Sequence, residues 1–453
     1  FFFKQKTAYE IPKRDWSSDV CSSDLYLNDV ESAKDYLFDI AKYKQSEREL
    51  EHRMERFRAN PCYEIIGTNF LCNLGEIHLN RLNPYNLNEQ IEAFKVGGLI
   101  VVSLLHHKFN DEKFQYSREI DPIVGVSFTG LFDFFVKLFG VDWLKWWQMG
   151  RPLQCNIIRV ETLNKLRGIS YDVYKLIYSH NYSNSDDAFF EDGKLFKILE
   201  QYFLNMWRDA AQQSVWDYCD REGLKRPNRI TTVQPSGTKS LLTGASCGWH
   251  PPKAQRYIRR ITFGKNDPVA LSCIDYGYSV VPSQSDKDEN GKLLNDPFDP
   301  RCTEWLVEIP VEVEWADIAD EANVDISKFS AAAQFDFFMQ VQTHYSQHNT
   351  SSTIELRKDE IEELSKKIYE AIQNNTPYIS TALLGRFDDI ESFPRLPFEP
   401  VSKKRYIELN SEVLKRRKSN DFYELMGHYN NVVDYANDHG SVACESEFCA
   451  IKK

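Results

Sequence analysis

The spacing of apolar and polar positions predicts a chain in which helices and strands alternate. Apolar residues at helical spacing predict helices over residues 26–59, 88–104, 131–136, 196–219, 329–341 and 358–372. Apolar or β-branched runs predict strands over residues 123–128, 229–234, 257–263, 304–313, 351–356 and 378–384. This alternation favours an α/β fold with parallel strands.

Two local features refine these helices. The run Asn-Pro-Tyr-Asn at residues 83–86 predicts a turn, and Asn88 is the expected N-cap of the next helix, with Glu89 in its first turn. The aromatic-rich stretch over residues 131–147 contains three tryptophans near its end. Packing in a core explains such aromatics more often than ligand stacking does.

The length and composition of the chain are typical of a large globular protein. The chain has 453 residues, of which 42% are hydrophobic, so we expect two structural units or one large α/β unit. The formal charge of -12 argues against a general surface for nucleic acid or anionic membrane. No apolar run approaches the roughly 20 residues that span a bilayer, and no signal peptide is visible. Ten cysteines are too sparse for a disulfide scaffold, which favours the cytoplasm.

The first 25 residues have neither a helical nor a strand period. The stretch Phe1 to Leu25 resembles the translation of a sequencing-adapter oligonucleotide. We therefore expect it to be non-native and exclude it, Cys21 included, from the expected fold. On this expectation the native chain would begin upstream, and residues 26–453 would be the C-terminal part of a longer protein.

The stretch over residues 60–64 brings an amide, a thiol and a carboxylate together, on Asn60, Cys62 and Glu64. A second thiol, Cys72, follows Cys62 by ten positions. A cysteine beside a glutamate in an apolar neighbourhood is more often buried and inert than reactive. The reactive interpretation gains weight from two further stretches downstream.

The first of these is a Ser/Gly/Thr/Lys turn between a predicted strand and an apolar helix start at Leu241. Backbone amides and hydroxyls at the positive end of a helix suit a phosphate group, and a glycine allows close approach. The candidate phosphate-binding residues are Ser236, Gly237, Thr238, Lys239 and Ser240. The turn lacks the spacing of an ATPase phosphate loop, and an ordinary capped turn explains it equally well.

The second is a pair of cysteines, Cys444 and Cys449, five positions apart in a polar C-terminal tail. A zinc site would need closer cysteine spacing or histidine partners, and neither is present. Two surface thiols without a role remain an alternative. A mobile dithiol that exchanges with other disulfides matches the spacing and the polar surroundings.

Taken together, these stretches resemble ribonucleotide reductases over almost all of residues 26–453. The resemblance is closest to the monomeric adenosylcobalamin-dependent ribonucleoside-triphosphate reductases. It is carried by residues 60–64, Gly125 to Asp133, Gln234 to Ser246, Gly248 to Pro252 and the Cys444/Cys449 tail.

The resemblance implies reduction of ribonucleoside triphosphates to deoxyribonucleoside triphosphates, the precursors of DNA. Cys62 would be the thiyl radical that takes the 3′-hydrogen, and Glu64 would be the general base at the 3′-hydroxyl. Asn60 would hold the substrate hydroxyls. Cys72 would be one of two thiols that reduce the 2′-position.

The resemblance also implies the remaining parts. The Ser236 turn would bind the substrate phosphates, while Cys444 and Cys449 would re-reduce the active-site disulfide and accept electrons from thioredoxin or a similar dithiol. Residues 26–435 would form the C-terminal portion of a ten-stranded α/β barrel with a central cysteine finger loop. Residues 436–453 would be a flexible redox tail.

The radical must come from a cofactor, because no side chain generates one unaided. Oxygen-dependent members of the family receive it through two adjacent tyrosines, whereas the corresponding stretch here, residues 343–346, contains only Tyr345. No glycyl-radical motif is visible. Adenosylcobalamin is therefore the expected cofactor. The alternatives are the large subunit of a di-metal-dependent reductase and a nucleotide-binding remnant without radical chemistry.

Some family parts are not found before Asn60: the second redox cysteine, the effector site of this allosteric family and the first barrel strands. We therefore expect this chain alone not to turn over. Cys247 stands where close relatives are expected to have proline, and packing is its expected role. The same role is expected of the cysteines that match no motif, which are Cys155, Cys219, Cys273 and Cys302.

Overall fold

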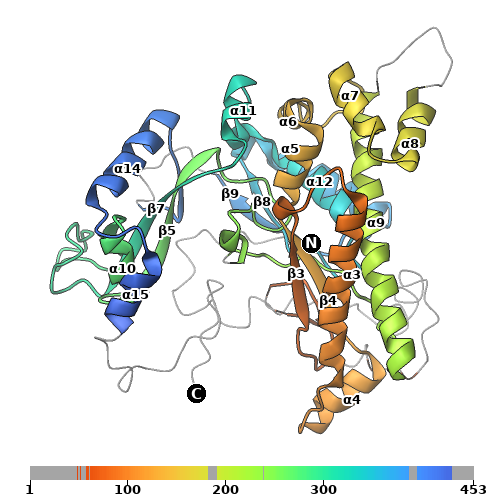
Figure 1. Cartoon of the computed structure of the whole chain (residues 1–453), viewed down its shortest axis with the longest axis horizontal. Coiled ribbons are helices and arrows are strands. Elements are labelled where there is room, and N and C mark those ends of the chain that lie inside the picture. Colours follow the sequence, from red (N-terminus) through yellow and green to blue (C-terminus); the bar gives the residue numbers. More distant parts are fainter. Residues whose placement is uncertain are drawn as a thin grey trace. The chain divides into compact units, whose positions relative to one another are not determined.

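The computed structural model describes residues 48, 52, 58–60, 62–181, 191–237, 239–386 and 395–430 (Figure 1). Four residues singled out above, Cys21, Thr238, Cys444 and Cys449, lie outside these ranges. The described residues form two compact units. The first takes those up to Pro251 together with Phe329–Arg386, and the second takes Pro252–Lys328 and residues 395–430.

The first unit contains strands and helices that alternate along the chain, as expected from the sequence. Its strands are β1 (Arg58–Ala59), β2 (Ile66–Gly67), β3 (Leu74–His78), β4 (Gly125–Thr129), β8 (Thr353–Leu356) and β9 (Ala382–Gly385). Its α-helices are α3 (Leu87–Ser103), α4 (Glu112–Ile120), α5 (Leu131–Phe139), α6 (Val141–Gln148), α7 (Val160–Arg167), α8 (Tyr171–Asn181), α9 (Asp192–Glu222), α12 (Ala331–His344) and α13 (Ile361–Gln373). Single 3₁₀ turns are η1 (Leu79–Arg81), η2 (Leu104–His106), η3 (Lys239–Leu242) and η5 (Lys358–Glu360).

Among the described residues of this unit, two of the three two-stranded sheets are parallel, as predicted, and the pair of β1 and β2 is antiparallel. β3 pairs with β4 and β8 pairs with β9, both in parallel. Between these pairs, residues 230–233 form parallel bridges to β4 and to the segment just before β8. The resulting array positions the candidate site. The α/β class is confirmed, and the ten-stranded barrel stays a prediction.

The predicted strand over residues 229–234 forms isolated bridges rather than a continuous ladder, Thr231 with Val126 and Val233 with Thr350. The reason lies in a side chain that competes for the backbone. Gln347 Oε1 accepts hydrogen bonds from the backbone N–H groups of Ile230 and Thr231. Those donors are therefore unavailable to a neighbouring strand.

Aromatic side chains fill the core beside the array. Trp143, Trp146 and Trp147 are fully buried, which confirms packing as their role. α3 and α9 lie against each other (Figure 1). A Cβ atom on Gly98 of α3 would lie only 2.9 Å from the backbone oxygen of Ala211 on α9, so glycine allows this close approach.

Two local predictions were wrong. The N-cap of α3 is Asn86, whose side chain accepts from the backbone of Glu89; Asn88 is already inside the helix. The helix expected over residues 26–59 does not reach its predicted end, because Arg58 and Ala59 pair with β2 as a strand.

The second unit is built on an antiparallel sheet in the order β10-β5-β7-β6. Its strands are β5 (Arg256–Gly264), β6 (Ser279–Pro282), β7 (Glu304–Glu312) and β10 (Phe398–Pro400), and its helices are α10 (Pro268–Asp275), α11 (Ala316–Glu321), α14 (Lys403–Arg416) and α15 (Phe422–Asn430), with a 3₁₀ turn η4 (Ile326–Lys328). The predicted strands at residues 257–263 and 304–313 exist. Their expected parallel organisation is wrong, since β5 and β7 pair antiparallel.

Candidate active site

The loop between β1 and β2 carries the first candidate groups. The backbone N–H of Asn60 donates to the Ile65 carbonyl at 3.0 Å, and Asn60 Oδ1 accepts from Ile65 N at 3.0 Å. Tyr63 N donates to the Asn60 carbonyl at 2.8 Å. Asn60 therefore closes the loop that presents Cys62 and Glu64.

This loop rests on the middle of the parallel array. The Glu64 carbonyl accepts from the hydroxyl of Thr232 at 2.5 Å and from the backbone N–H of Asn349 at 3.2 Å. Ile65 is fully buried, and a Cβ on Gly125 would lie 3.2 Å from its Cδ1 atom. Glycine in β4 thus leaves room for the loop to sit directly on the strands.

Cys72 comes to the same place. Asn60 Nδ2 lies 3.6 Å from Cys72 Sγ, within the range of a weak hydrogen bond to sulfur. The residue is exposed as a whole, but its sulfur faces the loop. Burial of the thiol, with the charges of Glu64 and Cys62, raises the pKa of Cys72 to about 12. Cys72 is therefore a protonated thiol at neutral pH.

Glu64 has the environment of a general base. Its side chain is buried, with the residue 3% exposed, and burial raises its pKa above the ordinary 4.5. Interaction with Asn60 and the positive charge of Lys239 act in the opposite direction. Among the described residues, Glu64 Oε2 has no hydrogen-bond partner. A buried carboxylate with one oxygen open can accept a proton from a bound hydroxyl.

The Ser236 turn follows a segment that contacts this loop, since Thr232, four residues earlier, donates its hydroxyl to the Glu64 carbonyl. The charge of Lys239 also lowers the pKa of Glu64, against the effect of burial. The structure corrects its expected local form. Leu241 belongs to η3, one turn of 3₁₀ helix over Lys239–Leu242, and not to the start of an apolar α-helix. The helix-terminus argument for phosphate binding is therefore wrong. Anion contacts would have to come from Lys239 and from the hydroxyls and amides of the turn itself.

Inside the turn, polar groups already have protein partners. Ser236, at a left-handed φ of 56°, donates its hydroxyl to Glu76 Oε1, and Gln234 Nε2 donates to Glu76 Oε2. Lys239 Nζ donates to Gln234 Oε1 at 3.1 Å. Ser240 is buried, and its hydroxyl lies 3.5 Å from Cys247 Sγ.

Sequence reasoning missed three residues of this site. Glu76 and His78 alternate on β3, so a period of two could have placed them on one face. His78 Nε2 lies 3.9 Å from Glu76 Oε1. Asn349, which contacts the Cys62 loop from 286 positions away, has no local signal that would identify it.

Tyr345 has a core role. It is fully buried, its hydroxyl donates to the Val126 carbonyl at 2.9 Å, and its ring contacts Phe94 and Phe128. Burial raises its pKa well above 10. The lone tyrosine of this stretch therefore supports β4.

The remaining described cysteines differ in burial. Cys219, Cys273 and Cys302 are buried, as expected of packing residues, while Cys155 and Cys247 are partly buried. Among the residues that the structure describes, no group of three His, Cys, Asp or Glu side chains could hold a metal ion.

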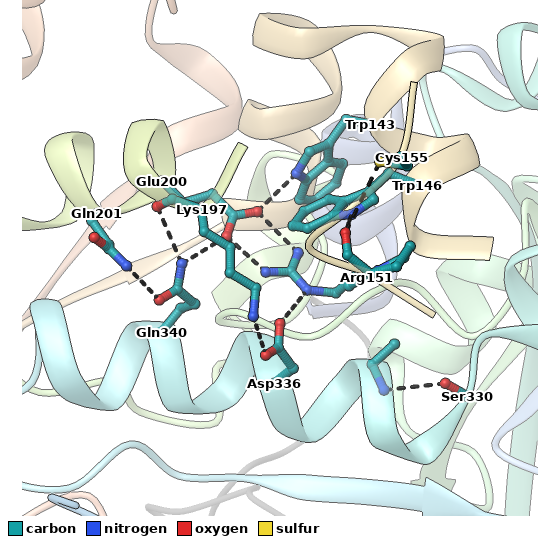
Figure 2. Close-up of polar contacts among 12 residues, drawn as sticks. Trp143, Trp146, Arg151, Cys155, Lys197, Glu200, Gln201, Ser330, Asp336 and Gln340 are labelled. Atoms are coloured by element: carbon teal, nitrogen blue, oxygen red, sulfur yellow. Dashed lines mark hydrogen bonds and ion pairs between the residues drawn. The ribbon is translucent and has the colours of Figure 1, made fainter. Parts of the chain in front are cut away.

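A charge cluster centred on the buried pair of Arg151 and Glu200 lies between α9, α12 and the segment after α6 (Figure 2). Arg151 donates to both oxygens of Glu200, at 2.9 and 2.7 Å, and to Asp336 at 2.8 Å. Lys197 also donates to Asp336. The cluster ties the end of α6 to α9 and α12, and α12 leads directly into the segment that holds Asn349.

The fold is similar to that of a solved protein. The crystal structure of a B12-dependent (class II) ribonucleotide reductase matches with a TM-score of 0.55 and 20% sequence identity, over 83% of this chain and 44% of that one. The described architecture is thus similar to part of the fold of that protein.

Curated sequences give the particular protein that the chain is similar to. Adenosylcobalamin-dependent ribonucleoside-triphosphate reductases match it from Lactobacillus gasseri (24% identity over 362 residues, 78% of this chain and 40% of the relative) and Levilactobacillus brevis (24% over 403 residues, 87% and 45%). The reductase of Lactobacillus leichmannii matches at 27% over 264 residues, 58% of this chain and 31% of the relative. The resemblance proposed from the sequence is confirmed.

The chain spans less than half the length of these curated relatives. No family model matches it. In the part of the chain that the structure describes, no helix has the length and apolar character needed to cross a membrane.

Proposed function

We propose that this chain carries the substrate-reducing site of an adenosylcobalamin-dependent ribonucleoside-triphosphate reductase in the cytoplasm. The reaction replaces the 2′-hydroxyl of the ribose with hydrogen and releases water, while two thiols become a disulfide. The observation that carries the proposal is the convergence at one loop of the Cys62 thiol, the Glu64 carboxylate and the Cys72 thiol, joined by Asn60.

Each group of the loop has a state that suits its proposed role. Glu64, with its raised pKa and an open oxygen, takes the proton of the 3′-hydroxyl. Cys62 takes the 3′-hydrogen as a thiyl radical. Cys72 stays protonated, so it can give a hydrogen atom and then form the disulfide with a second thiol. Asn60 holds these groups close together through its contacts with Cys72 and with the backbone of Ile65.

The phosphates of the substrate are proposed to bind at the Ser236 turn. Lys239 supplies the positive charge and is exposed, while Gly237 leaves its backbone open because a Cβ there would meet nothing within 4 Å. The remaining proposed ligands are Ser236, Thr238 and Ser240. The turn lies close enough to Glu64 for the Lys239 charge to affect that carboxylate, which suits one substrate held at both ends.

The donor set around Cys62 matches a site that receives its radical from a cofactor. It holds thiols, a carboxylate, an amide and a lysine, none of which generates a radical alone. Adenosylcobalamin would supply that radical. Tyr345 is a buried core residue, which argues against the tyrosine relay of a di-metal-dependent enzyme.

Re-reduction of the site is proposed to use Cys444 and Cys449, with thioredoxin or a similar dithiol as the electron donor. Both cysteines lie outside the described residues. The second thiol that pairs with Cys72 is proposed to come from another part of the complete protein.

The test is an assay of the complete protein with adenosylcobalamin, a ribonucleoside triphosphate and a dithiol. Cys62→Ser should abolish deoxyribonucleotide formation, while Cys155→Ser, whose sulfur contacts the Pro152 carbonyl, should retain it. Nucleotide binding without turnover in the unaltered protein would instead support a binding remnant. Retained turnover in Cys62→Ser would refute the radical assignment.

A further inference from the structure

Tyr63 has an unusual backbone conformation between the two reactive residues. Its φ is 60°, in the left-handed region that residues with a Cβ atom rarely adopt. Cys62 and Glu64 flank it directly. Because one dihedral at this position sets the direction of the chain between them, the relative placement of thiol and carboxylate depends on keeping Tyr63 in this conformation.

Asn349 contacts this position from a distant part of the sequence. Its side-chain Nδ2 donates to the Tyr63 carbonyl at 2.6 Å, and its backbone N–H donates to the Glu64 carbonyl at 3.2 Å. The residue is 1% exposed, so both bonds are shielded from water. The hydroxyl of Thr232 lies 2.8 Å from the Asn349 carbonyl and also reaches the Glu64 carbonyl.

The orientation of the Asn349 amide follows from its neighbours. Nδ2 faces the Tyr63 carbonyl and the Ser380 hydroxyl, the latter at 3.1 Å. The reverse orientation would set Oδ1 against a carbonyl oxygen, placing two acceptors together. In the present orientation Oδ1 is buried and has no partner among the described residues. The amide therefore serves the Tyr63 carbonyl even though its own oxygen stays unsatisfied.

The backbone next to Asn349 is held in place by two contacts. The next residue, Thr350, forms a parallel bridge with Val233, and its backbone N–H donates to Gln342 Oε1 at 2.8 Å. Gln342 lies on α12 and is buried. The Asn349 side chain thus contacts the Cys62 loop from a backbone position that both the parallel array and α12 hold.

We propose that Asn349 is a positioning residue that holds Tyr63 in its left-handed conformation and so sets the Glu64 carboxylate relative to the Cys62 thiol. The chemical consequence rests on the proposed reductase function, whereas the conformational role does not. Asn349 acts only through the loop backbone.

Glycine at position 63 gives a direct test, because glycine adopts positive φ without the cost that tyrosine bears. With Tyr63→Gly, the loop should keep its conformation even when the Asn349 contact is removed. Asn349→Asp keeps the shape of the side chain and removes the donor. Ser380→Ala is the matched control, since it removes the other contact of the amide and leaves the Tyr63 contact in place.

The measurements use the complete protein in the unaltered, Asn349→Asp, Asn349→Ala, Tyr63→Gly, Ser380→Ala and double-variant forms, the double variants combining Tyr63→Gly with either Asn349 change. The first readout is the rate at which iodoacetamide alkylates Cys62, followed by peptide mass spectrometry, which needs no turnover. The second is kcat and KM, with the melting temperature recorded throughout.

We expect Asn349→Asp to change Cys62 alkylation about threefold or more and to lower kcat about tenfold or more, with KM changed less, because misplaced groups slow the chemical step. Tyr63→Gly should restore both values in either double variant to within about threefold of Tyr63→Gly alone.

Two results would overturn the proposal: unchanged alkylation in both Asn349 variants, or equal defects with tyrosine and glycine at position 63. If Asn349→Ala does not fold, the comparison of Asn349→Asp with tyrosine and with glycine at position 63 tests the proposal alone. A protein without reductase activity would refute the proposed function, yet the alkylation pattern would still support or overturn the role of Asn349.

Discussion

The hydroxyl of Ser236 donates its hydrogen bond to Oε1 of Glu76, a carboxylate whose side chain is only 4% exposed. A hydroxyl has a single proton to donate, so Ser236 cannot give the same proton to a phosphate oxygen while this bond exists. The carboxylate also carries a negative charge at the place where a triphosphate is proposed to bind. Glu76 therefore opposes phosphate binding at the turn.

From this relationship we predict that Glu76→Gln binds a ribonucleoside triphosphate about three- to tenfold more tightly, because one buried negative charge beside the phosphates is removed. Equilibrium titration of the complete protein measures this directly. Glu92→Gln, an exposed site on α3, is the control and should leave affinity unchanged. Weaker binding in Glu76→Gln would mean that the carboxylate orients Ser236 for the ligand.

The Glu76 contact illustrates what the sequence could and could not predict. The regular elements with strong periodicity were predicted well, for example α5, where eight of nine residues are buried. Strand pairing was not, because β5 and β7 have the same local pattern whether they pair parallel or antiparallel. Pairing depends on contacts between distant segments, which no local window contains.

The candidate site divides in the same way. Asn60, Cys62, Glu64 and Cys72 lie close in the sequence, and the structure brings them together. Asn349 reaches this loop only because α12 and the parallel array return the chain to it. An asparagine in an ordinary polar run carries no sign of such a contact, so only the folded chain could identify it.

The reactivity of Cys72 should depend on Glu64. Burial and the charges of Glu64 and Cys62 raise the pKa of Cys72 to about 12, so the reactive thiolate is scarce at pH 8. Glu64→Gln removes one of those charges, lowers the pKa and should speed alkylation of Cys72 about threefold at that pH. Peptide mass spectrometry after iodoacetamide treatment measures the rate. An unchanged or slower rate would show that the carboxylate charge does not reach the sulfur.

Stability should fall in alkali because of the buried thiols. Burial is the main cause that raises the pKa of Cys219, Cys273 and Cys302 to about 11 each, against an ordinary value of 9.0. The folded chain therefore keeps these protons while the unfolded chain loses them. Below pH 9 the thiols are protonated in both states, and the folded chain has the full stabilising contribution. As pH rises from 9 to about 11, the unfolded chain loses these protons first, so the free energy of unfolding falls over this range.

Near pH 10, we expect each of these three thiols to lower the free energy of unfolding by about 1 kcal/mol relative to pH 8. Urea denaturation under reducing conditions at both pH values tests this. Cys273→Ala should weaken the dependence on pH, even though the cavity lowers stability at every pH. The same slope with and without Cys273 would contradict the assignment.

Arg151 should be the most sensitive charged residue of the buried cluster in Figure 2. It is fully inside the protein and bonds Glu200, whose side chain is equally buried. Burial alone would raise the pKa of Asp336, but the charges of Arg151 and Lys197 lower it. Arg151→Met leaves Glu200 without its cation, so the free energy of unfolding should fall by about 3–5 kcal/mol in urea denaturation at pH 7.

The control is Arg221→Met, which breaks an exposed ion pair on α9 and should lower the free energy of unfolding by less than about 1 kcal/mol. Adding Glu200→Gln to Arg151→Met should recover part of the loss, because the uncompensated charge is then gone; no recovery would show that packing of the arginine against Trp146 and Trp147 matters more than its charge.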